Sequence, residues 1–269
     1  MTRIAIAGAA GRMGRNLVLA CHEAEDLLVT QALEHNESPA LGNDCGLLAG
    51  LPANGILVSD HLDADAFDLL IDFTHPLATA GHVDYCLENQ KKMVIGTTGA
   101  DDSLNRKITQ AGDLIALVYA PNMSVGVNLC FQLLQSTAAV LGDDFDIEII
   151  EAHHRNKVDA PSGTALKMGE IVAAALDRNL DDCAVYGREG QTGARERKTI
   201  GFETVRAGDI VGEHTVLFAG EGERIEITHR ASSRMNFAHG AVRASRWLAD
   251  QNRGFFTMQD VLGFSPGHS

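Results

Sequence analysis

The sequence predicts an α/β protein in two parts: an N-terminal domain built on a parallel sheet, and a smaller α+β domain with a mixed sheet. Three observations support this fold class. Short apolar runs alternate with helical patterns from the first residues onward, a glycine-rich turn follows the first apolar run, and the pattern changes after Asn122. Strands that alternate with helices favour a parallel sheet covered on both faces.

Each strand of the first part is predicted from a short apolar run, and each helix from apolar residues at helical spacing. The predicted strands cover residues 4–7, 27–33, 69–73, 93–95 and 114–119. The predicted helices cover residues 12–20, 76–90 and 101–111, and the stretch 35–55 is expected to be irregular.

The second part begins with a long apolar helix, predicted at 125–141, and continues with a strand at 146–152 and a helix at 164–176. On the first helix the expected core face carries Leu129, Leu133, Leu134, Ala138 and Leu141. Three further strands are predicted at 200–205, 215–218 and 224–228, with glycine-containing segments between them that suggest hairpin connections. A last amphipathic helix follows, and its pattern alone does not assign it to either part.

Composition and charge exclude several classes of protein. The chain has 269 residues, 45% hydrophobic and 22% charged, as in ordinary globular proteins. The net charge of −14 argues against nucleic acid as the main partner, because phosphate binding needs a basic face. No signal peptide is expected, nor an apolar stretch of the roughly 18 residues that a membrane span needs. Five cysteines without a Cys-x-x-Cys pair suggest reduced thiols, and we expect a cytoplasmic protein without a membrane partner.

The glycine-rich turn predicts a Rossmann-like nucleotide site. Gly8, Gly11 and Gly14 lie between the first strand and the first helix, a spacing variant of the dinucleotide fingerprint. They would allow a sharp turn, close approach of the backbone to a pyrophosphate, and close helix–strand packing. Glu34 ends the second strand, where a carboxylate can bind a ribose. The alternative is a plain turn and a solvated acid.

The densest group of functional side chains lies at 151–164. His153 and His154 leave a predicted strand, and Lys157 follows within four residues. A histidine can exchange a proton near neutral pH, and the lysine adds a positive charge. The alternatives are a solvated basic loop and a metal site. We predict no metal, because adjacent histidines on a strand cannot both face one ion and no third ligand has matching spacing.

The same segment predicts an anion site at a helix start. Ser162 or Thr164 can cap the helix, and the first N–H groups, of Gly163 and Thr164, point away from the helix body. Two turns at strand ends of the first part, 96–99 and 120–123, are further candidates to cover a nicotinamide.

Taken together, these segments resemble the dihydrodipicolinate reductase family, also called 4-hydroxy-tetrahydrodipicolinate reductases, of bacterial lysine and diaminopimelate synthesis. The matching segments occur in order along nearly the whole chain, and the run from Glu151 to Thr164 is highly specific for that family. They are residues 8–14, 96–99, 122–128, 151–164, 206–214 and 231–234.

The resemblance implies that hydride passes from NADH or NADPH to a small cyclic imine dicarboxylate, giving tetrahydrodipicolinate with loss of water. It implies His153 as the general acid–base, Lys157 as a second proton donor, and His154, Gly163 and Thr164 as carboxylate-binding residues. The implied nucleotide-binding residues are Gly8, Ala9, Ala10, Gly11, Arg12, Met13, Glu34, His35, Gly96, Thr97, Thr98, Ala120, Pro121, Asn122 and Met123.

The resemblance also implies a domain organisation and an assembly. Residues 1–124 would bind the nucleotide, and residues 125–233 would bind substrate and form a homotetramer through their sheet. The C-terminal segment 234–269 would pack back on the nucleotide domain.

One position departs from the family pattern. Members that use NADPH well carry arginine directly after the ribose-binding acid, whereas this chain has His35. Histidine offers a weaker, pH-dependent charge to a 2′-phosphate. Arg12 is near enough in sequence to help, and we expect use of both coenzymes with NADH favoured.

Two other functions are compatible with a nucleotide fold. A semialdehyde or homoserine dehydrogenase is one, but a semialdehyde enzyme needs a nucleophilic cysteine at a helix start, and none of the five cysteines offers it. A non-catalytic nucleotide sensor is the other, and it would leave the histidine–lysine segment without a role.

Overall fold

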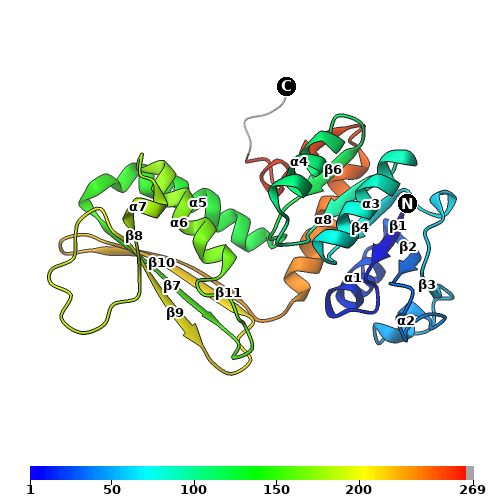
Figure 1. The fold of residues 1–269 in the computed structure, drawn as a ribbon, viewed down its shortest axis with the longest axis horizontal. Helices are drawn as coiled ribbons and strands as arrows, with labels where there is room; N and C mark the ends of the chain where they lie inside the picture. The colour runs from blue at the N-terminus through cyan, green and yellow to red at the C-terminus, as the bar shows by residue number, and fades with distance from the viewer. Residues whose placement is uncertain (265–269) are drawn as a thin grey trace. The chain divides into compact units, whose positions relative to one another are not determined.

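The computed structural model describes residues 1–264, which form two compact units. One unit consists of Met1–Val125 together with the chain from Arg234 onward, and the other is Gly126–Ser233. Figure 1 labels most of the helices and strands of both units.

The first unit is built on a seven-stranded parallel sheet with the order β12-β6-β5-β4-β1-β2-β3. Its strands are β1 (Thr2–Ala7), β2 (Leu27–Leu33), β3 (Val58–Ser59), β4 (Leu69–Asp72), β5 (Lys92–Ile95), β6 (Ala116–Tyr119) and β12 (Gly254–Phe256). The chain runs outward from β1 to β3 and then returns to the other side of β1 with β4. At such a reversal the carboxyl ends of the strands form the ligand-binding crevice of open parallel sheets. The predicted Rossmann-like fold class is confirmed.

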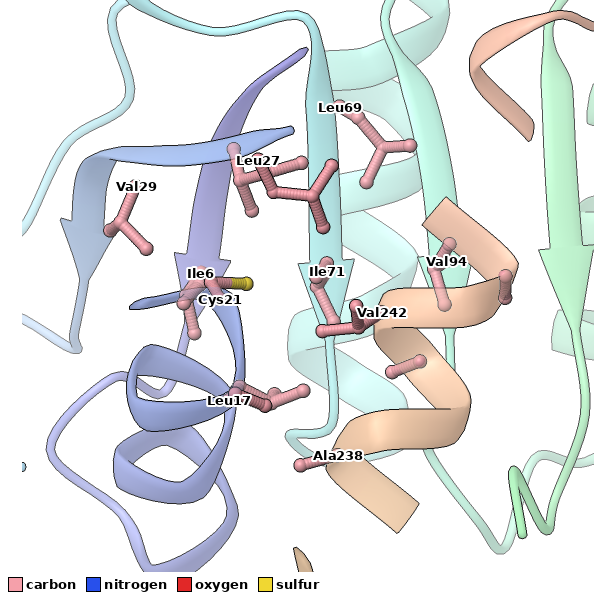
Figure 2. Packing of buried hydrophobic residues seen from close by; sticks show 14 of the residues in the cluster. Ile6, Leu17, Cys21, Leu27, Val29, Leu69, Ile71, Val94, Ala238 and Val242 are labelled. Carbon is pink, nitrogen blue, oxygen red and sulfur yellow. The ribbon is translucent and has the colours of Figure 1, made fainter. Parts of the chain in front are cut away.

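Helices cover both faces of this sheet. Figure 2 shows Leu17 of α1 and Val242 of α8 packed on the face that carries Ile6 and Ile71. The opposite face is covered by α3 and α4, whose buried side chains meet Leu70. Because β4 is buried from both sides, its apolar residues form a continuous run instead of alternating. The helices are α1 (Arg12–His22), α2 (Cys45–Leu48), α3 (Pro76–Glu88), α4 (Asp102–Ala111), α8 (Met235–Ala249) and α9 (Met258–Val261), with a 3₁₀ turn η1 (Ala64–Ala66).

The elements missed by sequence reasoning in this unit are short. The stretch expected to be irregular contains α2, a single turn capped by the Asp44 side chain, which accepts a hydrogen bond from the Leu47 N–H. Strands β3 and β12 have two and three residues and lie at the two sheet edges. Runs of this length carry no periodicity that a sequence pattern could detect.

The second unit contains a five-stranded mixed sheet with the order β11-β10-β7-β9-β8. Strands β8, β9 and β7 are parallel, whereas β10 is antiparallel to both β7 and β11. Helices α5 and α6 pack on one face of the sheet (Figure 1). The elements are α5 (Val125–Leu141), η2 (Gly142–Asp144), β7 (Asp146–His153), α6 (Gly163–Ala175), α7 (Leu180–Cys183), β8 (Ala184–Tyr186), β9 (Ile200–Arg206), β10 (Gly212–Ala219) and β11 (Arg224–Ala231).

One predicted connection in this sheet is wrong. The segment at Gly208 and Asp209 was expected to join two strands as a hairpin, but β9 and β10 do not pair. Both strands pair with β7, which lies between them. A glycine turn between two apolar runs indicates a change of direction and leaves the strand partner undetermined. The other predicted connection, at Gly220–Gly222, does join an antiparallel pair, β10 and β11.

The core face of α5 also differs from the expectation. Leu134 and Ala138 are buried against the sheet, but Leu129 and Leu133 are 43% and 45% exposed in this unit. By length and composition alone, the segment Val125–Asp144 is apolar enough to cross a membrane, which corrects the expectation that no stretch would qualify. Of the most apolar part of this segment, 28% is buried, and Cys130, Leu134 and Ala138 belong to the core of the second unit.

Candidate functional site

A cavity of about 590 Å³ lies in the first unit, and its walls include residues from the carboxyl ends of β1, β2 and β4. The glycine turn and the start of α1 line one side, with Arg12 and Met13. At the ends of β2 and β3 the cavity is lined by Glu34, His35 and Asp60. Phe73, Thr74, His75, Ala78 and His82, after β4, complete the lining together with Arg234. The cavity therefore includes the sheet reversal, where a nucleotide is expected.

Gly8 and Gly14 have the structural roles that the sequence suggests, a sharp turn and close helix–strand packing. Gly8 has φ +66°, a conformation that side chains with a Cβ disfavour. A Cβ on Gly14 would lie 2.0 Å from the Gly8 carbonyl oxygen, so only glycine lets α1 start this close to β1. Gly11 is the N-cap of α1 and provides no side-chain cap, which leaves the helix start facing the cavity. These features fit a dinucleotide pyrophosphate.

Glu34 lines the cavity and also contacts the glycine turn. Its Oε1 accepts a hydrogen bond from the Ala10 N–H at 3.0 Å, and its own N–H donates to the Ser59 carbonyl at 2.9 Å. These two bonds hold the carboxylate over the turn, at the end of β2 next to β3. His35 and Arg12 line the same cavity. The acid and the two basic side chains are therefore brought together, as the sequence suggests.

Sequence reasoning missed a polar cluster at the end of β4. The Asp72 carboxylate is fully buried and accepts hydrogen bonds from the Thr74 N–H at 2.9 Å and hydroxyl at 2.6 Å. Its second oxygen lies 2.8 Å from Nδ1 of His82, which lines the cavity. Burial by itself would raise the pKa of Asp72, but the His82 and Thr74 contacts lower it below its ordinary value. An acidic residue that ends a strand beside the sheet reversal is the signal that could have found this cluster.

Two predicted segments do not line this cavity. Thr97 is buried, and its hydroxyl lies 2.8 Å from the Thr79 hydroxyl and 3.3 Å from Asp72. Gly96 packs so closely on Phe73 that a Cβ would lie 2.3 Å from the ring. The other residues of these segments, Thr98, Ala120, Pro121, Asn122 and Met123, are exposed, half-buried or part of the core, and so are Ala9 and Ala10 of the glycine turn, which do not line the cavity either. Their role in nucleotide binding stays a prediction.

In the second unit, one sheet face is apolar at one end and polar at the other. Alternate residues of a strand share a face, and on β7 this face carries Ile147 and Ile149 in the core, followed by Glu151 and His153. The neighbouring strands follow the same pattern: β9 places Arg206, and β10 places His214, at the polar end. The start of α6 lies at this end too, because the Ser162 N–H donates to Glu151 at 3.1 Å. The polar residues therefore lie on the same sheet face as the apolar core, at one end of the strands.

Glu151 lies at the centre of this group. Its carboxylate, with a fully buried side chain, contacts His153 Nδ1 at 2.6 Å and accepts two hydrogen bonds from Arg206, at 2.7 and 2.8 Å. Burial by itself would raise the pKa of Glu151, but the bonds from Arg206 and His153 lower it. The pKa of His153 is lowered, chiefly by burial and further by the charges of Lys157 and Arg206, although the adjacent Glu151 carboxylate opposes this shift. The structure thus pairs an ionised acid with a neutral imidazole at neutral pH.

The other predicted residues surround this pair. Lys157 Nζ lies 2.9 Å from the Asp159 carboxylate, in the segment between β7 and α6. Ser162 caps α6, its hydroxyl accepting from the Ala165 N–H at 3.2 Å, so Gly163 and Thr164 form the first turn. Among residues 1–264, no hydrogen-bond partner lies within reach of the buried His154 Nδ1. The unit therefore presents a basic side chain, a helix start and an unpaired imidazole nitrogen near one histidine.

Burial also determines the protonation of His214 and of the cysteine thiols. His214 packs edge-on against His153, and burial lowers its pKa to about 3, so this second histidine is neutral. Burial raises the pKa of each of the five cysteine thiols, to about 12 for Cys21, which does not fit the thiolate nucleophile of a semialdehyde dehydrogenase. In the described part of the chain, no three His, Cys, Asp or Glu residues are grouped as a metal site would require.

Comparison with known proteins identifies the family. The model of the dihydrodipicolinate reductase N-terminus matches residues 2–123, and that of the C-terminus matches residues 126–262. A solved structure of dipicolinate-bound dihydrodipicolinate reductase from Paenisporosarcina sp. TG-14 is 27% identical, with a TM-score of 0.73, and the match covers 97% of this chain and 98% of that one.

More distant structures share the fold alone. An amine dehydrogenase from Mycobacterium smegmatis is 12% identical with a TM-score of 0.53, covering 96% of this chain and 95% of that one. A myo-inositol dehydrogenase from Corynebacterium glutamicum is 14% identical with a TM-score of 0.55, covering 94% and 90%. Since both family models match and together span nearly all of the described residues, the chain belongs to the dihydrodipicolinate reductase family, the reductases of lysine and diaminopimelate biosynthesis.

Proposed function

We propose that this reductase converts 4-hydroxy-tetrahydrodipicolinate to tetrahydrodipicolinate, with the polar end of the second sheet as its substrate site. The hydroxyl group leaves as water together with one ring hydrogen, and a hydride from the nucleotide and a proton then add to the conjugated ring that results. The observation that carries the proposal is the contact of both His153 and the start of α6 with the buried Glu151, with the Lys157 charge close enough to His153 to lower its pKa. A dicarboxylate bound by the solved relative supports a substrate of this chemical class.

The start of α6 and the basic side chains would bind the two substrate carboxylates. The first N–H groups of a helix, at Gly163 and Thr164, favour an anion. His154, whose Nδ1 is buried and has no hydrogen-bond partner among residues 1–264, would be a further member of this site. Lys157 would exchange its contact with Asp159 for one with the substrate, since both partners are carboxylates.

His153 would act as the acid–base group, with Lys157 as a second proton donor. The Nδ1 of His153 contacts Glu151, so its Nε2 is the nitrogen available for proton exchange. The neutral ring at pH 7 is not yet an acid. A doubly negative substrate nearby favours the imidazolium form of His153. Substrate binding would therefore protonate this ring, and the ring would then donate the proton to the substrate.

The first unit would hold the reduced nicotinamide nucleotide, which supplies the hydride when bound. The glycine turn and the start of α1 fit its pyrophosphate, and Glu34 fits a ribose hydroxyl. We propose that the enzyme accepts both NADH and NADPH and favours NADH, since the residue after Glu34 is a histidine.

The decisive experiment is an assay of NADH loss with freshly generated substrate, comparing the parent with His153→Gln. Turnover should fall by about 10²- to 10⁴-fold, the usual contribution of a positioned acid–base group. Nucleotide affinity, measured by calorimetry, should stay unchanged because His153 belongs to the other unit. Turnover within about threefold of the parent would remove His153 from the mechanism, and nucleotide binding without any turnover by the parent would favour the sensor alternative.

We also propose a cytoplasmic homotetramer that forms through the sheet of the second unit. The sheet face opposite α5 and α6 carries Ile150 and Val205, which are 41% and 44% exposed. Apolar side chains in the middle of an open sheet face favour burial against another sheet.

A further inference from the structure

The buried Glu151 contacts both the proposed acid–base histidine and the helix start that would bind the substrate. Its Oε2 lies 2.6 Å from His153 Nδ1, and its Oε1 accepts from the Ser162 N–H, directly before α6, at 3.1 Å. Arg206 donates to both oxygens, and Thr204 contacts Oε1 at 3.4 Å. One carboxylate therefore joins the acid–base histidine to the helix start that would bind the substrate anion.

Arg206 extends this connection to a third segment. Besides its two bonds to Glu151, its guanidinium donates to the Asp159 carbonyl at 2.6 Å. Asp159 in turn forms the ion pair with Lys157. The pair of Glu151 and Arg206 is thus bonded to the three segments that carry His153, Lys157 and the start of α6.

We propose that Glu151, held by Arg206, is the positioning residue of the reaction: it fixes the tautomer of His153 and the spacing between that ring and the start of α6. The proposal rests on the proposed function, in which these two groups act on the same substrate. Glu151 does not need to touch the substrate for this role, and its side chain is fully buried.

The chemistry of the contact determines the tautomer. A carboxylate only accepts hydrogen bonds, so Nδ1 of His153 carries the proton and Nε2 is left as the exchanging nitrogen. Gly212 lies beside this nitrogen, and a Cβ there would lie 3.0 Å from Nε2. Glycine at this position keeps the reactive nitrogen approachable.

The charges around His153 predict what loss of Glu151 would do. The ring faces Glu151 on its own strand, Lys157 in the following segment, Arg206 on β9 and His214 on β10. Of these, Glu151 alone is negative. Without its charge, the cations that remain would disfavour the imidazolium and lower the pKa of His153 further.

The test uses the full-length enzyme with ¹⁵N-labelled histidine and compares Glu151→Gln with Asp143→Asn. Asp143 is a control in the same unit: its carboxylate also pairs with an arginine, Arg178, but it lies in η2, before the start of β7 and at the other end of that strand from Glu151. In the parent, NMR should show His153 with the proton on Nδ1. In Glu151→Gln, the His153 pKa should fall, kcat should drop by about 10²-fold, as for a misplaced catalytic group, and KM should rise.

A second pair of variants covers the case in which Glu151→Gln does not fold. Glu151→Asp keeps the charge but shortens the side chain, and Arg206→Lys keeps the charge but loses the paired donors. Both should lower kcat while the circular dichroism spectrum and the nucleotide affinity stay those of the parent. The control should match the parent in kcat, KM and His153 pKa.

Two results would overturn the proposal. One is a parent enzyme whose His153 carries its proton on Nε2. The other is a folded Glu151 variant with parental kcat and His153 pKa, even if its melting temperature falls, since that pattern indicates structural support alone. If the parent does not reduce the dicarboxylate, the proposed function fails, and the tautomer and pKa measurements still decide the positioning role.

Discussion

A buried carboxylate beside a histidine occurs in both units. Asp72 lies 2.8 Å from Nδ1 of His82, and Glu151 lies 2.6 Å from Nδ1 of His153. In each pair burial opposes ionisation of the acid, but hydrogen bonds lower its pKa. An ionised acid orients the ring and leaves the other nitrogen for a ligand. The first pair lies at the proposed nucleotide cavity and the second at the proposed substrate site.

A single residue, His35, should set the coenzyme preference. In His35→Arg, a permanent charge with paired donors would face the 2′-phosphate of NADPH. Charge-assisted hydrogen bonds of about 1.5–3 kcal/mol predict that NADPH affinity rises by about 10- to 100-fold, while NADH affinity changes little. Calorimetry with both nucleotides measures the ratio. An unchanged ratio would place the 2′-position away from residue 35.

The buried His214 should make the second unit sensitive to acid. Its pKa is about 3 in the folded protein and about 6.5 when unfolded, so below pH 6.5 the unfolded chain binds a proton that the folded chain does not. This contribution to stability is present above pH 6.5 and is lost as the pH falls from 6.5 toward 3.

Urea unfolding of the parent and of His214→Asn at several pH values measures this contribution. The parent should lose more stability than the variant between pH 6.5 and 4, because other acid-sensitive groups are common to both. Equal losses would contradict the assignment to His214.

At the scale of elements, the start of α1 depends on close packing. A Cβ on Gly14 would meet both the Gly8 carbonyl oxygen and the Ala9 Cα, at 2.0 and 2.6 Å. Gly14→Ala should therefore push α1 away from β1, lower the free energy of unfolding by about 1–3 kcal/mol and weaken nucleotide binding.

Gly81→Ala in α3 is the matched control, since nothing lies within 4 Å of its added Cβ. Alanine is favoured over glycine inside a helix, so the control should be neutral or slightly stabilising. Urea unfolding and nucleotide titration compare the two variants. A Gly14 variant as stable as the control would show that α1 can shift without cost.

The long elements could be predicted from sequence because their periodicity is local. The predicted boundaries of β2 and α5 agree with the structure at both ends. The core face of α5 could not be assigned in the same way. Leu129, Leu133 and Leu134 fit similar helical spacing, and the choice among them depends on where the sheet lies.

At the scale of the whole molecule, the proposed tetramer can be tested on the open face of the second sheet. Ile150→Asp would place a charge in the middle of the apolar face, so the assembly should dissociate into smaller species. Val140→Asp, at an 84% exposed position of α5, makes the same change away from that face and should leave the mass unchanged. Multi-angle light scattering measures both. A monomeric parent, or an Ile150 variant with the parental mass, would contradict the assembly.

The sequence by itself determined the fold class, the glycine turn with Glu34, and the segment that carries His153 and Lys157. Each of these features depends on residues close together in the chain, through a hydrophobic period or a fixed spacing. Only the tertiary structure decided that β7 lies between β9 and β10, and this placement brings Arg206 and His214 to Glu151. Pairing between strands far apart in the chain depends on how entire sheet faces pack, and a local sequence pattern does not specify it.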